Sequence, residues 1–220
     1  MSFRERAYTF NGAVLAATGI SDHEAFVRMV EEEFPAPAPG SEAAATVKSE
    51  YMGGEARLSV PSTGHAHVAL AFQGPTSAPV MNVLKHCLNM SGASAFAAPG
   101  VMGVYGGSSP SDASATIDTL SNAIGAAPSD VDISSAKEAA KNEALAALAS
   151  GSKSLADAMT ASILDSCGFS AKGLAESYDN VTADQVAKAH AAMLKSKLSL
   201  AAVGDISDVP YHATIASRFA

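Results

Sequence analysis

Two histidines in the stretch 51–75, YMGGEARLSVPSTGHAHVALAFQGP, are the residues whose type and spacing could do chemistry. His65 and His67 are two positions apart, so on a β-strand both imidazoles lie on one face and could share a zinc ion. A structural or catalytic zinc needs three or four protein ligands, and the spacing predicts no third ligand. We therefore favour a strand whose histidines face solvent or form hydrogen bonds.

Other reactive side chains in the sequence also have a structural interpretation. Glu55 and Arg57 share a strand face, which favours an ion pair on the surface or between domains over acid–base chemistry. Cys87 and Cys167 are far apart, form no Cys-x-x-Cys motif and have no base or cation arranged beside them in sequence. We expect two free, mostly buried thiols that are neither nucleophiles nor a disulfide.

The composition limits the classes of protein to which the chain can belong. It has 220 residues, of which 48% are hydrophobic and 16% charged, enough for one large domain or one domain with a fragment. The net charge of -8 and the pI of about 5.1 argue against a nucleic-acid-binding surface. No run approaches the roughly 18 apolar residues of a membrane span, so we expect no transmembrane segment.

Hydrophobic periodicity predicts strands that alternate with helices, which indicates an α/β fold. In the segment 65–73, Ala66, Val68, Leu70 and Phe72 lie on one face of a predicted strand. The other predicted strands are 13–18, 53–60, 101–107 and 198–204. Helices are predicted at 22–34 and 79–90, after Pro110, and over most of 130–196, whereas 91–100 lacks periodicity and is predicted to be a loop.

An internal repeat divides the chain. VLAATG-ISD at 14–22 recurs as SLAAVGDISD at 199–208 with one extra residue. The match is either a coincidence between alanine-rich strands or the end of each half of a duplicated domain. In the second case, 1–36 is the strand–helix tail of a first half whose body is absent. Residues 37–47 are then a Pro/Ala linker, and 48–220 form a second α/β domain.

With this division, the chain resembles the C-terminal half of the pitrilysin/insulinase-like (M16) family, and in particular its alpha-type members. The resemblance rests on VLAATGISDHEAFVRMVEEEF, YMGGEARL, HAHVALAFQGP, SSAKEAAKNEALAAL and the ending VTADQ…SRF, taken in combination. It implies a mixed sheet with helices packed on one side. M16 peptidases bind zinc through His-x-x-Glu-His on a helix, but none of the six histidines here has another four residues on. The resemblance therefore implies a non-catalytic chain without a metal or cofactor.

The chain departs from the alpha-type pattern after the predicted helix 79–90. There the family has a glycine-rich loop thought to engage presequences, and LNMSGASAFAAPG retains only Gly92 and Gly100 of it. These two glycines are the residues that the resemblance assigns to a presequence contact. The family has a further helix and strand in this region that the chain lacks, so the sheet is expected to be smaller by one strand.

The resemblance implies a scaffold subunit similar to core protein 2 of mitochondrial complex III, ubiquinol–cytochrome c reductase, on the matrix side of the inner membrane. The implied partners are a beta-type subunit similar to core protein 1, other complex III subunits and a separate chain that supplies the first half. Two alternatives stay open: an alpha-type, substrate-recognising subunit of mitochondrial processing peptidase, or an M16 half repurposed in another mitochondrial complex.

Overall fold

A computed structural model describes residues 13–34, 50–164 and 170–219 of the chain. These residues belong to two compact units, a larger one formed by 50–143 with 175–220 and a smaller one formed by 1–49 with 144–174. The predicted linker 37–47 lies outside the described residues, and the predicted domain boundaries stay a prediction.

A mixed five-stranded sheet forms the centre of the larger unit, with the strand order β1-β5-β2-β4-β3. The strands are β1 (Gly54–Ser59), β2 (Ala66–Gln73), β3 (Ser94–Ala98), β4 (Val101–Ser108) and β5 (Ser199–Gly204). β1 is parallel to β5, and all other pairs are antiparallel. The predicted α/β class with a mixed sheet is confirmed.

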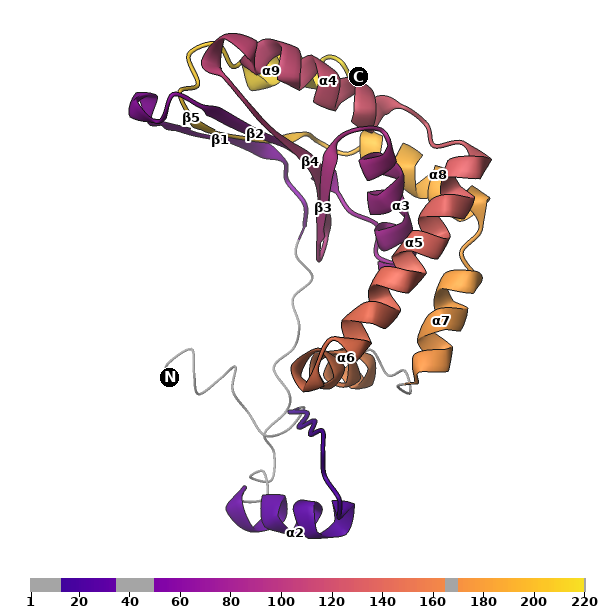
Figure 1. Ribbon diagram of the computed structural model, residues 1–220. Helices are drawn as coiled ribbons and strands as arrows, with labels where there is room; N and C mark the ends of the chain where they lie inside the picture. Colours follow the sequence, from indigo (N-terminus) through magenta and orange to yellow (C-terminus); the bar gives the residue numbers. More distant parts are fainter. Residues whose placement is uncertain (1–12, 35–49, 165–169, 220) are drawn as a thin grey trace. The chain divides into compact units, whose positions relative to one another are not determined.

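The helices of the larger unit cover one face of this sheet, as Figure 1 shows. They are α3 (Ala78–Met90), α4 (Ala113–Gly125), α8 (Ala183–Leu194) and the short α9 (His212–Ala216). Two 3-10 turns, η1 (Pro61–Thr63) and η2 (Pro110–Asp112), follow β1 and β4. Gly106 of β4 lets α4 approach closely, because a Cβ there would lie 3.0 Å from Thr116 and 3.2 Å from Leu120.

The core lies between the sheet and these helices. Ala66, Val68, Leu70 and Phe72 are almost completely buried, which confirms the predicted alternation of β2. Neighbouring strands and helices complete the core with Met102 and Val104 of β4, Leu200 and Ala202 of β5, Val83 and Leu84 of α3, Ile117 and Ile124 of α4, and Val186 and Met193 of α8.

Four more helices lie in the described residues: α2 (His23–Glu33), α5 (Asp130–Ala149), α6 (Ser152–Leu164) and α7 (Ala171–Asp179). Within the larger unit, α5 is joined to the end of α7, where Lys137 Nζ donates to the carbonyl oxygen of Asp179 at 2.7 Å and Lys141 pairs with its carboxylate at 2.8 Å. None of the described helices combines the length and the apolar character that a helix needs to cross a membrane.

The predicted strand at 13–18 is wrong. Residues 13–17 have no regular secondary structure, although the following helix α2 forms with Asp22 as its N-cap, accepting from Ala25 N–H at 2.9 Å. A strand requires a hydrogen-bonded neighbour, and no strand among the described residues pairs with this segment. The similar segment 199–204 has such neighbours and forms β5.

The predicted loop at 91–100 is also wrong, because it contains the edge strand β3. The small residues of SAFAA give no alternation, so only tertiary pairing with β4 defines this strand. Pro99 and Gly100 form the two-residue turn between β3 and β4, and Gly100 has a φ of 78°. Proline followed by a glycine at positive φ fits a type II turn, which explains this glycine without a ligand.

Candidate interaction surface

The face of the sheet opposite the helices is the main candidate for an interaction surface, and we call it the open face. No described helix of the larger unit covers it (Figure 1). Leu58, Val203 and Tyr105 lie there with 59%, 43% and 43% of their surface exposed, and Leu58 and Val203 are direct cross-strand neighbours. Exposed apolar side chains that adjoin one another are typical of a surface that meets another protein.

The segment before β1 contacts one end of the open face through Tyr51. The Tyr51 hydroxyl lies 2.7 Å from Ser199 Oγ and donates to the carbonyl oxygen of Ala71 at 3.1 Å. Burial raises the pKa of this phenol. Beside it lies a hollow of about 420 Å³ whose walls include Ala71 and Ala201, with Phe96 at one side. Its walls are mainly apolar, so it can accept an apolar side chain.

The two histidines that suggested a metal lie near this face but make other contacts. His67 Nδ1 is 2.6 Å from the Tyr105 hydroxyl, and the two rings stack with centroids 6.0 Å apart. The His65 ring is 6.5 Å from the His67 ring, and His65 precedes β2 rather than belonging to it. Among the described residues, no group of three or more His, Cys, Asp or Glu side chains could hold a metal ion.

Glu55 and Arg57 form the predicted ion pair, with Nε and Oε1 2.5 Å apart. They project toward the helix-covered side, where the Arg57 guanidinium also donates to the carbonyl oxygens of Val209 and Pro210. The guanidinium carbon lies 5.4 Å from the centre of the Tyr211 ring. Hydrogen bonding from Arg57 lowers the pKa of Glu55. The pair therefore anchors the segment before α9 to the edge strand β1.

A second charged cluster was not predicted from the sequence. Lys85 Nζ lies 2.9 and 3.0 Å from the two carboxylate oxygens of Glu143, and His86 Nε2 lies 2.6 Å from one of them. The hydrogen bond from Lys85 is the main reason why the pKa of Glu143 is lowered. The partners are 57 and 58 residues apart in the sequence, so no local sequence pattern predicts their contact. The cluster joins α3 to α5.

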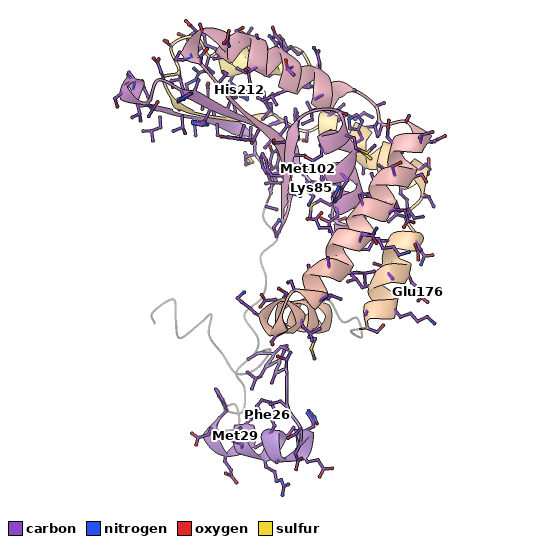
Figure 2. The ribbon with its side chains drawn as sticks, viewed as in Figure 1. Phe26, Met29, Lys85, Met102, Glu176 and His212 are labelled. Carbon is purple, nitrogen blue, oxygen red and sulfur yellow. The ribbon has the colours of Figure 1, made fainter. Side chains whose placement is uncertain are left out.

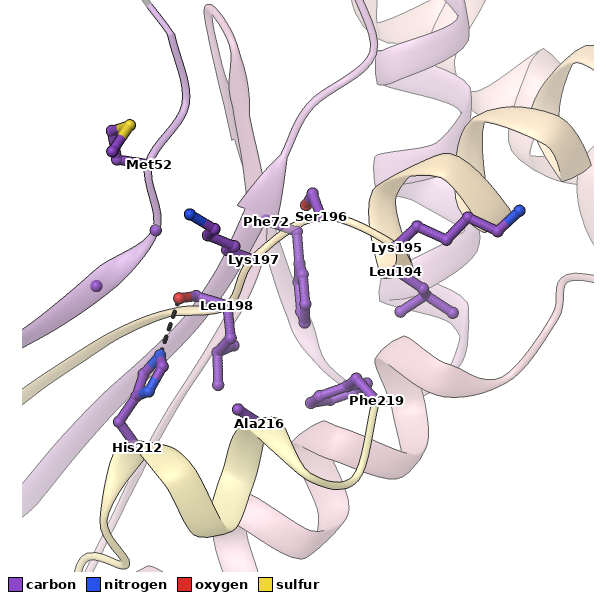
Figure 3. Close-up of a pocket in the computed structure, with 12 residues that line it drawn as sticks. Met52, Phe72, Leu194, Lys195, Ser196, Lys197, Leu198, His212, Ala216 and Phe219 are labelled. Atoms are coloured by element: carbon purple, nitrogen blue, oxygen red, sulfur yellow. Dashed lines mark hydrogen bonds between the residues drawn. The ribbon is translucent and has the colours of Figure 1, made fainter.

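A pocket of about 430 Å³ lies between α8, α9 and the start of β5 (Figure 3). Its floor is apolar, with Phe72 and Phe219 in an edge-to-face contact at 5.0 Å and Leu198 beside them. His212 Nε2 donates to the carbonyl oxygen of Leu198 at 3.0 Å. Lys195, in the turn at the rim, projects away from the pocket in Figure 3. No nucleophile with an adjacent base is found among these lining residues, which suit an apolar group rather than a reaction.

The remaining predicted site residues have structural surroundings. Cys87 is a free, buried thiol, and burial raises its pKa to about 11, so little thiolate is present at neutral pH. Cys167 lies outside the described residues. Gly92, with a φ of 87°, and Gly100 lie in the turns at opposite ends of β3. Their contact with a presequence stays a prediction.

Comparison with known proteins adds one result. No family model and no curated protein sequence matches the chain. Among solved structures, a chain of complex III2 from Candida albicans, solved with Inz-5 bound, is similar with a TM-score of 0.66 and 15% sequence identity. The similarity covers 90% of this chain and 56% of that one. The chain therefore has a fold that is found in complex III2, and it spans about half the length of the chain it matches.

Proposed function

We propose that this chain is a non-catalytic scaffold subunit of a mitochondrial respiratory assembly, similar to core protein 2 of complex III. The observation that carries the proposal is the fold shared with a chain of complex III2 over 90% of the present chain. The resemblance of its motifs to the C-terminal half of alpha-type M16 proteins supports the same assignment. Such a subunit lies on the matrix side of the inner membrane.

The surfaces of the larger unit support a role in assembly rather than in catalysis. The open face exposes apolar side chains over several strands, whereas the charged clusters at Arg57 and Glu143 join elements of the fold to one another. None of the six histidines in the sequence has another four residues on, as the zinc motif of M16 peptidases requires. The chain would thus act through the partners that it holds together.

The partners that we propose are a beta-type subunit similar to core protein 1, other complex III subunits and a chain that supplies the first half of the fold. The repeated segment at 14–22 supports such a first half, because its second copy forms β5 within a sheet. A partner sheet or helix would then cover the open face.

The proposal can be tested by purifying the tagged chain from its own mitochondria under native conditions and identifying the proteins that co-migrate with it. We expect co-migration with ubiquinol–cytochrome c reductase activity. Leu58→Glu should remove the chain from this complex because it places a charge on the open face. The matched control is Val131→Glu, since Val131 is 75% exposed at the start of α5, away from the sheet. A chain that migrates alone, or equal loss with both variants, would contradict the proposal.

The acidic net charge of -8 favours a second candidate function, recognition of basic presequences as the alpha-type subunit of a processing peptidase. The candidate contact residues are Gly92 and Gly100. The assembled complex would be titrated with a fluorescent presequence peptide and with the same peptide with its arginines replaced by glutamine. Preferential binding of the basic peptide, reduced by Gly92→Val, would favour this function over a purely structural one. Co-migration with a different respiratory complex would instead indicate a repurposed M16 half.

A further inference from the structure

The two copies of the repeated segment, 14–22 and 199–208, differ at two positions and by one inserted residue. The structure of the second copy shows which positions are buried. In β5 and just after it, Leu200, Ala202 and Ile206 have 2%, 0% and 9% of their surface exposed, and Gly204 is buried as well. The first copy has the same residue type at all four places: Leu15, Ala17, Gly19 and Ile20. Every buried position is therefore identical in the two copies.

The two positions that differ lie on the open face instead. Val203 is 43% exposed there, and the first copy has Thr18 at this place. Ser199, whose hydroxyl lies 2.7 Å from that of Tyr51, corresponds to Val14. A coincidence between two alanine-rich strands has no reason to confine the differences to one face. The pattern instead indicates that both copies have one buried side and one open side.

The first copy lacks such surroundings among the described residues. Leu15 and Ile20 are 58% and 44% exposed, whereas their counterparts are buried. No backbone hydrogen bond joins residues 14–19 to another described segment, although β5 is hydrogen-bonded on both sides. A Cβ at Gly204 would lie 2.1 Å from a backbone carbonyl oxygen, but one at Gly19 would have no neighbour within 4 Å. The segment thus has the side chains of a central strand without its sheet.

We propose that residues 14–19 form the central strand of a sheet in the partner that supplies the first half of the fold. They would lie between two strands of that partner, parallel to one that corresponds to β1 and antiparallel to one that corresponds to β2. Leu15 and Ala17 would point to the helix-covered side of the partner sheet. The inference deepens the proposed function and rests on the existence of this partner, whichever respiratory assembly contains it.

The sheet of the larger unit is not the acceptor, because its place for such a strand is filled. β5 lies between β1 and β2, and it is continued on both sides by hydrogen bonds from Val60 N–H to Gly204 at 2.7 Å and from Asp205 N–H to His65 at 2.9 Å. A second copy of this chain has the same strand in the same place. The acceptor is therefore a different sheet, with a β1-like and a β2-like strand and no strand of its own between them.

The helix that follows each copy agrees with this placement. α9 follows β5, and its Ile215 is completely buried, while Phe219 just beyond it contacts Phe72 in the core. α2 follows the first copy directly, with Asp22 of the repeat as its N-cap, and none of its residues is buried. Insertion of 14–19 into the partner sheet would bring α2 to the end of that sheet, where the partner can cover its apolar side.

Site-specific photo-cross-linking in intact mitochondria tests this placement. A diazirine-bearing side chain replaces Ala16, which corresponds to Ala201 on the open face. Ala201 lies between Ala56 and Ala69, which are 13 residues apart in the sequence. We expect cross-links to two sites with about this spacing in one partner protein, identified by mass spectrometry. The same side chain at the exposed Val131 is the control and should give no such pair of sites.

Two charge substitutions at neighbouring positions provide the second measurement. Ala17→Asp places a carboxylate where the counterpart Ala202 is completely buried. The cross-linked partner should then fall by roughly tenfold or more in native purifications of the tagged chain, because an unpaired charge is costly to bury. Thr18→Asp, at the place of the exposed Val203, is the matched control and should retain the partner. Neither residue belongs to the larger unit, whose unfolding should be the same in both variants.

The outcomes separate this inference from the proposed function. Retention of the partner in Ala17→Asp, equal loss with both variants, cross-links at fewer than two sites, or cross-links to β1 and β2 of a second copy would each overturn the inference while the partner still co-purifies. An unsubstituted chain that binds no such partner would overturn the proposed first-half partner together with the inference.

Discussion

Phe72 lies near the C-terminal end of β2 on its helix-covered face, where its ring is fully buried and contacts Phe219 edge to face. We predict that Phe72→Ala lowers the free energy of unfolding by about 3–5 kcal/mol, the range for truncation of a buried aromatic residue. His67→Ala, on the exposed face of the same strand, should cost far less because it removes mainly one contact with Tyr105. Urea unfolding of both variants measures the difference.

The same two variants distinguish a purely structural role of β2 from a functional site at its histidines. In the assembled complex, Phe72→Ala should deplete the chain, because a loss of this size is a large part of the stability of a domain. His67→Ala should leave assembly and respiration near normal. An activity lost with His67→Ala while the complex stays intact would show that the histidine stretch is a functional site.

Metal content gives a separate test of the histidines. We predict that the purified chain contains no stoichiometric zinc, since His67 Nδ1 is engaged by the Tyr105 hydroxyl and the sequence predicts no third ligand near His65. Elemental analysis after dialysis without chelator measures this content. About one zinc per chain, lost in His65→Ala, would refute the prediction.

Glu143 should make stability depend on pH. Its pKa is lowered from the ordinary value of 4.5 in the folded chain, chiefly by the hydrogen bond from Lys85, so the carboxylate stabilises the fold above that value. This contribution is lost as the pH falls through the lowered pKa. We predict that Glu143→Gln destabilises the chain at pH 7 and has no effect once the pH lies below the folded pKa of Glu143. Denaturant unfolding of both proteins at pH 7 and at a pH below the folded pKa of Glu143 measures this difference in stability.

The exposed pair of Asp184 and Lys188 on α8 is the control for this experiment. Exposed ion pairs within one helix contribute little, so Asp184→Asn should change stability less than Glu143→Gln at pH 7. Equal effects of the two substitutions, or an effect of Glu143→Gln that persists in acid, would contradict the assigned role of the cluster.

Sequence alone predicts pairs of residues only when their spacing is short. Glu55 and Arg57 are two positions apart on one strand, and their ion pair follows from the alternation of side chains. Lys85 and Glu143 meet only because α3 and α5 are brought together by the fold, so no local rule could find them. The same is true of His67 and Tyr105, which neighbouring strands bring together.

At the scale of elements, α8 is the helix whose start is best explained by residues close together in the sequence. Thr182 Oγ accepts from Gln185 N–H at 3.3 Å, and the Gln185 side chain accepts from Thr182 N–H at 3.0 Å, which together form a capping box. We predict that Thr182→Ala costs about 1 kcal/mol of stability. Denaturant unfolding measures this cost, with Thr119→Ala on α4, whose hydroxyl bonds only to its own helix, as the control that should cost less.

Elements were predictable where burial imposes a period on the sequence. β2 alternates and α4 repeats its apolar residues at helical spacing, because each has one face against the core. β3 consists of small residues beside Phe96, and the edge position leaves it without a pattern. The segment 13–18 has the composition of a strand, but no strand among the described residues pairs with it. Composition therefore indicates what a segment can form, and pairing decides what it forms.

At the scale of the whole molecule, the order of strands in the sheet could not be derived from periodicity. β1 and β5 are neighbours although about 140 residues separate them, and only the resemblance to a known family suggested a mixed sheet covered on one side. The open face also has no sequence signature. Its exposed Leu58 and Val203 look like ordinary strand residues until the helices are seen to cover only the other face.

The helix α2 leads to the last prediction. It has a capped N-terminus and an apolar side, from which Phe26 and Met29 project (Figure 2), yet it buries none of its residues. Met29 and Phe34 are 54% and 50% exposed. A helix of 11 residues is marginal in water and normally depends on packing against other parts of a protein. We infer that a partner covers this apolar side in the native assembly.

The isolated chain should consequently be unstable or prone to aggregation. Met29→Gln with Phe34→Gln should increase the soluble fraction after centrifugation and leave the unfolding of the larger unit unchanged, because neither side chain belongs to its core. Met102→Gln, at a buried core position, is the control that should lower both solubility and stability. A chain that stays soluble and unfolds cooperatively without any partner would contradict this prediction, because the apolar side of α2 would then need no cover.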